Sequence, residues 1–164
     1  DFYWRVGMTH SALTQWSYGK TRVATNSPRA LGSDNYLTTG DAVTFLAALD
    51  GGTLLPAAET AALKGWLTLS PRSGYGGWLG SDLPAGMRGA MMHKAGWLPP
   101  GCCGDDGYYN TLNEIGIVEA PNGHRLAMAI FARRGDDYWN KQAPFVSHAA
   151  CVLVAAADPQ VTCP

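Results

Sequence analysis

Three short motifs in this chain hold serine, lysine and asparagine at spacings that serve serine acyl transfer. They are Ser17-Tyr-Gly-Lys20, Ser33-Asp-Asn35 and Lys94-Ala-Gly96, in that order along the chain. A serine and a lysine three residues apart on a helix share one face, so the amine can take the hydroxyl proton. A Ser-x-Asn loop adds a second hydroxyl and an amide, and a Lys-x-Gly strand adds a cation beside a flat edge on which a substrate can lie.

The spacing of the first two motifs does not suit a nucleophile helix followed by a separate loop. Only 12 residues separate Lys20 from Ser33, and at roughly 1.5 Å per residue these make at most about three helical turns. Gly19 falls inside the would-be helix and costs about 1 kcal/mol there. We therefore predict that both motifs are ordinary loop residues, and that the third motif is the one that carries chemistry.

The elements that would position the third motif include two helices in the first part of the chain. Thr39 is read as the N-cap of a helix that Gly51-Gly52 ends, and Asp41 lies in its first turn, where a negative charge suits the helix dipole. A second helix is predicted to open at Pro56, because proline is a good first-turn residue. Its apolar face would hold Leu63, Trp66 and Leu67.

The later part of the chain predicts a three-strand antiparallel meander with flanking helices, and so an α+β fold. Between the second and third strands lies Pro121-Asn-Gly-His124, whose Asn-Gly pair readily takes the positive φ of a hairpin turn. With no repeat and no linker, residues 1–164 are read as one unit. The strands are predicted at Ala90–Trp97, Asn113–Ala120 and Arg125–Arg133, and a last helix at Pro144–Ala157.

Composition excludes several classes of protein. Apolar residues make up 46% of the 164 residues and charged residues 15%, which argues against a disordered chain. The formal net charge is −1 and the 12 lysines and arginines are scattered, which argues against a nucleic-acid partner. The longest apolar stretch, Ala149–Ala157, is well short of the roughly 20 residues that a membrane span needs.

The four cysteines indicate disulfides and an exported protein rather than a metal site. No pair has the Cys-x-x-Cys spacing, and the four histidines are far apart, so we expect neither a metal nor a cofactor. Adjacent cysteines rarely bond each other, so Cys102 and Cys103 are predicted to pair with Cys151 and Cys163, in an order left open. The alternative is four buried free thiols. The chain starts at Asp1 with no signal peptide, and we read it as a mature or excised fragment.

The surroundings of Lys94 resemble the class A β-lactamases and the wider superfamily of serine β-lactamases and D-alanyl-D-alanine peptidases. His93-Lys-Ala-Gly-Trp97 occupies the place of the family's Lys-Thr-Gly strand, and the likeness extends over nearly all 164 residues. It corresponds to roughly the C-terminal 60% of the family's chain. Further matching segments are Val6–Leu13, Thr38–Gly52, Leu83–Gly86 and Asn113–Val118.

The resemblance implies roles for the residues of this strand. Lys94 would supply the cation that favours an anionic substrate carboxylate, Ala95 and Gly96 would line the substrate, and the N–H of Trp97 would be one oxyanion-hole donor. In that register Ser17-Tyr-Gly-Lys20 falls in the family's Ω-loop. The true nucleophile would then lie upstream of Asp1, in a missing N-terminal segment of the same fold. The chain would be an exported fragment, inactive alone, whose substrate is a small molecule or a peptide.

Two departures from the family pattern bear on the activity that the resemblance implies. Ala95 stands where the family has Thr or Ser, and residues 1–58 contain no Glu to activate a hydrolytic water from the Ω-loop. They favour a peptidase-like or esterase-like hydrolase over an efficient β-lactamase. They equally suit a non-catalytic binding or scaffold protein of the cell envelope, such as a lipoprotein or a cell-wall module. A third alternative is an independent disulfide-stabilised domain with a coincidental likeness.

Overall fold

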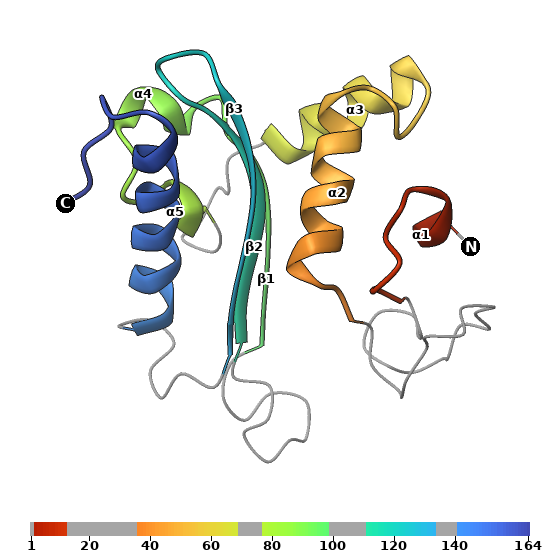
Figure 1. The fold of residues 1–164 in the computed structure, drawn as a ribbon, viewed down its shortest axis with the longest axis horizontal. Coiled ribbons are helices and arrows are strands. Elements are labelled where there is room, and N and C mark those ends of the chain that lie inside the picture. Colours follow the sequence, from red (N-terminus) through yellow and green to blue (C-terminus); the bar gives the residue numbers. More distant parts are fainter. Residues whose placement is uncertain (1, 13–35, 69–76, 99–110, 134–140) are drawn as a thin grey trace. The chain divides into compact units, whose positions relative to one another are not determined.

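The computed structural model describes residues 2–12, 36–68, 77–98, 111–133 and 141–164, and contacts within it form two compact units, residues 1–56 and 57–164. Ser17-Tyr-Gly-Lys20, Ser33-Asp-Asn35, Cys102 and Cys103 lie outside the described residues. The mixture of helices and antiparallel strands confirms the α+β class (Figure 1). The elements are α1 (Phe2–Arg5), α2 (Thr39–Asp50), α3 (Ala57–Thr68), η2 (Trp78–Gly80), α4 (Ala85–Arg88), β1 (Met92–Leu98), β2 (Thr111–Glu119), β3 (Arg125–Arg133) and α5 (Ala143–Ala157).

The first unit is built around α2, whose start lies one residue earlier than predicted. The N-cap is Thr38 rather than Thr39: Thr38 is extended, with φ −94° and ψ 155°, and its hydroxyl accepts a hydrogen bond from the N–H of Asp41 at 3.2 Å. Thr39 is already helical. A threonine hydroxyl can satisfy an orphan N–H only from the extended position before the first turn, which explains the shift.

Asp41 ties this helix start to the segment that precedes it. Its buried carboxylate accepts from the N–H of His10 and from the Ser11 hydroxyl, both at 2.7 Å. Ala12 and Tyr36 exchange two backbone hydrogen bonds, of 3.0 and 3.1 Å. The side chain that was predicted to serve the helix dipole therefore also holds residues 10–12 against the helix.

The second unit contains the sheet, and its topology confirms the predicted meander. The strand order is β1-β2-β3, with both pairs antiparallel. The bounds of β3 match the prediction, and those of β1 and β2 differ from it by one or two residues. At the hairpin between β2 and β3, Gly123 has φ 82° and the N–H of Ala120 donates to the carbonyl of His124 at 2.8 Å.

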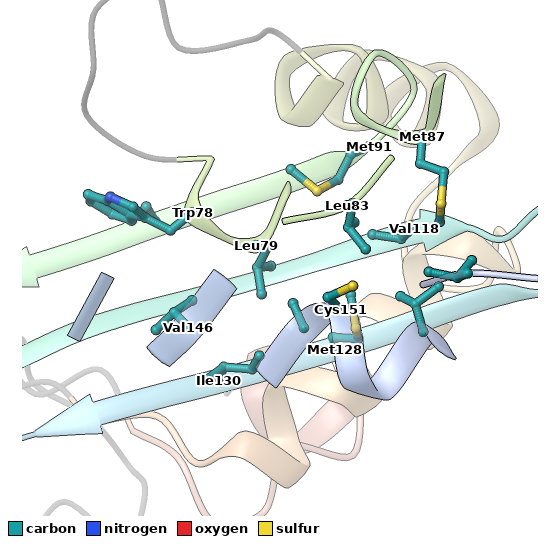
Figure 2. Packing of buried hydrophobic residues seen from close by; sticks show 14 of the residues in the cluster. Trp78, Leu79, Leu83, Met87, Met91, Val118, Met128, Ile130, Val146 and Cys151 are labelled. Atoms are coloured by element: carbon teal, nitrogen blue, oxygen red, sulfur yellow. The ribbon is translucent and has the colours of Figure 1, made fainter. Parts of the chain in front are cut away.

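One face of the sheet is covered by α5 and η2, and the core lies beneath them (Figure 2). Ser147, buried on α5, donates its hydroxyl hydrogen bond to the carbonyl of Trp78 at 2.8 Å, so helix and turn are joined as well as packed. The apolar side chains between these layers come from η2, α4, α5 and all three strands, and include Trp78, Leu79, Leu83, Met87, Leu112, Val118, Met128, Ile130, Val146, Ala150, Cys151 and Val154.

The predicted disulfide pairing is wrong. Cys151 is bonded to Cys163, so neither of them pairs with Cys102 or Cys103. The physical reason is the turn that follows α5, in which the N–H of Val161 donates to the carbonyl of Asp158 at 3.0 Å. That turn reverses the chain and brings the two Cα atoms to 5.8 Å, well inside the range that a disulfide spans.

The helix over 57–68 forms as predicted, but its predicted apolar face is only partly buried. Trp66 is 69% exposed, while Leu63 and Leu67 are half-buried. The short elements α1, η2 and α4 were not predicted, because three or four residues are too few to show a periodic pattern.

Candidate functional site

The site residues predicted from the sequence lie together on β1. Among the described strands β1 pairs only with β2, so its other edge carries no strand. The side chain of Lys94 is exposed, and its ammonium group donates a hydrogen bond to the carbonyl of Ala95. Helix α3 lies beside this strand (Figure 1). The sheet therefore presents a lysine on an unpaired strand edge.

Strand alternation separates the four predicted residues into two pairs, because successive side chains point to opposite faces. Ala95 is 7% exposed and packs in the core, with Trp97 packed against the same cluster. Lys94 and Gly96 are exposed on the other face. A contribution from residue 95 to a bound substrate would therefore come from its backbone.

The two ends of the predicted substrate strand differ in how they are held. At Gly96, which pairs with Asn113, an added Cβ would meet no atom of the described residues within 4 Å, so the strand face opposite the core is open there among those residues. The ring of Trp97 packs edge-on against the ring of Trp78, with centroids 5.8 Å apart and an interplanar angle of 80°. Such edge-to-face pairs fix ring orientation as well as burying area.

A buried polar cluster lies on the core face of the same strands. The carboxylate of Glu114, on β2, is fully buried and lies next to the imidazole of His93, with 2.7 Å between Oε1 and Nδ1. The N–H of Gly77 donates to Oε1 and the N–H of Leu79 donates to Oε2, both at 2.9 Å. All three donors converge on one carboxylate, which satisfies a charge that would be costly to bury alone.

Sequence reasoning assigned no role to Glu114, although a signal for its burial was present. Leu112, Glu114, Gly116 and Val118 alternate along β2 and are all buried. An acidic side chain on the buried face of a strand needs hydrogen-bond donors. The donors could not be foreseen, because two of them are backbone N–H groups of a turn more than 30 residues earlier in the chain.

A second cluster contains Ser11, His10 and Asp41, which are the residue types of a catalytic triad, but its geometry excludes that role. In a triad the histidine lies between the serine and the carboxylate. Here the Ser11 hydroxyl donates directly to Asp41 Oδ2 at 2.7 Å and Ser11 is 1% exposed. The His10 ring is 68% exposed, with Nδ1 3.8 Å from Asp41 Oδ1. This cluster joins residues 10 and 11 to the first turn of α2, and it is not a nucleophile site.

The described residues contain no group of three or more histidine, cysteine or acidic side chains that could hold a metal ion. These residues offer a cation on Lys94, an open strand face at Gly96, and a core side held by aromatic packing and hydrogen bonds.

Comparison with known proteins gives this arrangement a family. The chain matches the model of the beta-lactamase enzyme family over residues 2–154, and it therefore belongs to that family. This confirms the resemblance that the sequence motifs indicated. No curated protein matches the chain.

Solved structures of similar fold include β-lactamases and PBP-A. The TLA-3 extended-spectrum β-lactamase superposes with a TM-score of 0.73 at 16% identity, over 95% of this chain and 52% of that chain. A class A β-lactamase from Bacteroides cellulosilyticus gives 0.64 at 20%, over 76% of this chain and 43% of that one. PBP-A gives 0.60 at 18%, over 86% and 47%. At these identities the likeness establishes the fold.

This chain thus spans about half the length of the solved structures that it matches. In the part of the chain that is described, no helix combines the length and apolar character needed to cross a membrane.

Proposed function

We propose that this chain is the C-terminal part of an exported, β-lactamase-like serine hydrolase, completed by an upstream segment that supplies the nucleophile. The observation that carries the proposal is Lys94 on β1, whose outer edge pairs with no other described strand, in a chain of this family. The match to about half of each solved relative supports the idea of a missing part. The substrate class is a β-lactam, a peptidoglycan-like peptide or an ester.

The reaction would be acyl transfer to the upstream serine. The serine oxygen forms a bond to the substrate's carbonyl carbon, the carbonyl–nitrogen or carbonyl–oxygen bond breaks, and the hydroxyl proton ends on the leaving group. Water then hydrolyses the acyl-serine to an acid and the free hydroxyl. The Lys94 ammonium would bind the substrate's carboxylate, the strand at Gly96 would take the substrate backbone, and the N–H of Trp97 would stabilise the oxyanion.

The test is covalent labelling of the full-length protein with a fluorescent penicillin, followed by mass spectrometry of the labelled peptide. A variant of PBP-A has been solved as an acyl-enzyme complex with penicillin G. We expect a label on a serine upstream of Asp1, and Lys94→Ala should reduce labelling about 100-fold, because an electrostatic contact made in the transition state is lost.

Lys141→Ala is the matched control, since it removes the same charge just before α5. It should label at the wild-type rate. A label on a serine within residues 1–164 would refute the assignment of the nucleophile to the upstream segment. Equal labelling of the Lys94 and Lys141 variants would remove Lys94 from the site.

A second candidate is a binding or scaffold protein of the same fold that does not turn over its ligand. Ala95, which offers no hydroxyl, and the absence of Glu from residues 1–58 favour it. A full-length protein that shows a thermal shift with penicillin or a peptidoglycan peptide, but no acylation, would support this candidate. Hydrolysis of nitrophenyl acetate that depends on the upstream serine would count against it.

Export is the remaining part of the proposal. The Cys151–Cys163 disulfide supports it, because such bonds persist mainly in oxidising compartments. Free thiols in intact cells are first blocked with N-ethylmaleimide, and the denatured protein is then reduced and treated with a maleimide polymer. The polymer should modify these two cysteines, because disulfide-bonded cysteines escape the first block. Absence of the polymer from both would place the protein in a reducing compartment.

A further inference from the structure

The buried carboxylate of Glu114 joins three separate elements. It belongs to β2, it accepts from His93 on β1 at 2.7 Å, and it accepts from the N–H groups of Gly77 and Leu79 around η2 at 2.9 Å each. An ionised carboxylate only accepts hydrogen bonds, so with Glu114 ionised the shared proton is assigned to the Nδ1 atom of His93. Three donors on a side chain with no exposed surface hold it in one position.

The backbone around this carboxylate is shaped to reach it. Gly77 has φ 81°, a left-handed conformation that suits glycine. It begins the turn in which the N–H groups of Gly77 and Leu79 both donate to the Glu114 carboxylate. Gly116 lies directly across from His93, and a Cβ there would come within 2.7 Å of the carbonyl oxygen of Met92. The absence of a side chain at residue 116 lets β1 approach β2 at the point where His93 meets Glu114.

These contacts bracket the stretch of β1 that carries the proposed site. At one end His93 directly precedes Lys94. At the other end Trp97 packs edge-on against Trp78, the residue between the two N–H groups that Glu114 binds. Glu114 lies opposite Ala95, on the core face, whereas Lys94 and Gly96 are exposed on the other. Glu114 therefore cannot touch a substrate on the Lys94 side, but it can determine the position of the part of β1 that carries Lys94.

We propose that Glu114 is a positioning residue for Lys94 and for the backbone of Gly96 and Trp97, acting through His93 at one end and through the Trp78 turn at the other. This role rests on the proposed acyl transfer. Reacting groups displaced by about 1 Å can lose on the order of 100-fold in rate, so a small shift of this strand should be measurable.

The experiment compares four variants of the full-length protein in penicillin acylation, separating the saturating rate from the apparent dissociation constant. Glu114→Gln keeps the shape but replaces one accepting oxygen with a donating amide, and should lower the saturating rate roughly 10- to 100-fold. The saturating rate of His93→Ala should fall by a similar factor. His93→Asn keeps an N–H donor on the strand and should stay within about three-fold of wild type, since the amide can restore the shared hydrogen bond.

Glu119→Gln is the matched control, because it removes a carboxylate from the same strand at an exposed pair with Arg125. It should acylate like wild type. Equal loss in His93→Asn and His93→Ala would show that the shared hydrogen bond is not what matters, and it would overturn the proposal. A wild-type saturating rate in Glu114→Gln would overturn it as well. If Glu114→Gln does not fold, the two His93 variants still decide the question.

A measurement without substrate separates failure of this proposal from failure of the proposed function. Amide NMR shifts of Lys94, Gly96 and Trp97 should move in Glu114→Gln and in His93→Ala, and should return toward wild type in His93→Asn. If wild type is not acylated but these shifts follow the pattern, the acyl-transfer function fails and the positioning of the strand stands. Unmoved shifts in Glu114→Gln would refute the positioning role whether or not the protein is acylated.

Discussion

Gly116 shows how one missing side chain determines the approach of two strands. Replacing it with alanine would put a Cβ 2.7 Å from the Met92 carbonyl oxygen and 3.0 Å from a Leu79 methyl group. The first contact is with backbone, which cannot rotate away. We expect Gly116→Ala to lower the free energy of unfolding by about 1–3 kcal/mol, as overpacking of a core does. Urea denaturation followed by tryptophan fluorescence measures it.

Gly65 gives the opposite result from the same substitution. It lies inside α3, where an added Cβ would meet nothing within 4 Å. Gly65→Ala should therefore raise the stability of that helix by up to about 1 kcal/mol, because alanine has the higher helix propensity. If Gly116→Ala and Gly65→Ala shift the denaturation midpoint in the same direction, the close contact at residue 116 does not determine the effect of Gly116→Ala.

At the scale of the element, the start of α2 depends on one hydroxyl. Thr38→Ala removes the acceptor for the Asp41 N–H and should cost about 1 kcal/mol. Amide hydrogen exchange in the first turn of α2 should then be about five-fold faster. Thr38→Ser keeps the hydroxyl and serves as the control, with exchange expected to stay near wild type. Equal amide exchange rates in Thr38→Ala and Thr38→Ser would show that the Thr38 hydroxyl does not stabilise the first turn of α2.

The elements also show where sequence patterns are informative and where they are not. β3 was predicted at its full bounds, because an Asn-Gly turn and a matched partner strand fix its register. Trp66 has helical spacing but is exposed, since periodicity says nothing about what lies opposite a helix face. The Glu114 cluster depends on a turn 37 residues earlier in the chain, and the pairing of Cys151 depends on the geometry of the turn after α5; the sequence pattern showed neither contact.

At the scale of the whole molecule, the disulfide fastens the C-terminal segment to α5. Its partners are 12 residues apart, and closing a loop of that size in the unfolded chain is worth about 3 kcal/mol. The double variant Cys151→Ala/Cys163→Ala should melt roughly 6–12 °C below wild type, as followed by circular dichroism. Reductant should lower the melting temperature of wild type by a similar amount.

The double variant with reductant is the control for that comparison, because Cys102 and Cys103 remain in it. Its melting temperature should change little on reduction. A large further drop would assign the stabilisation to those two cysteines, and equal melting of the wild-type and double-variant proteins would show that the Cys151–Cys163 bond is energetically neutral.

The position of α5 at the end of the unit has a consequence for synthesis. The helix that covers the sheet spans Ala143–Ala157 and follows β3, so a ribosome must synthesise the chain through α5 before this face of the sheet can be covered. Until then the face that carries Met128 and Ile130 remains open to water and to other chains. At roughly 5–20 residues per second this interval lasts seconds, which is long enough for aggregation. We expect a protein built this way to stay bound to a chaperone until α5 has been synthesised.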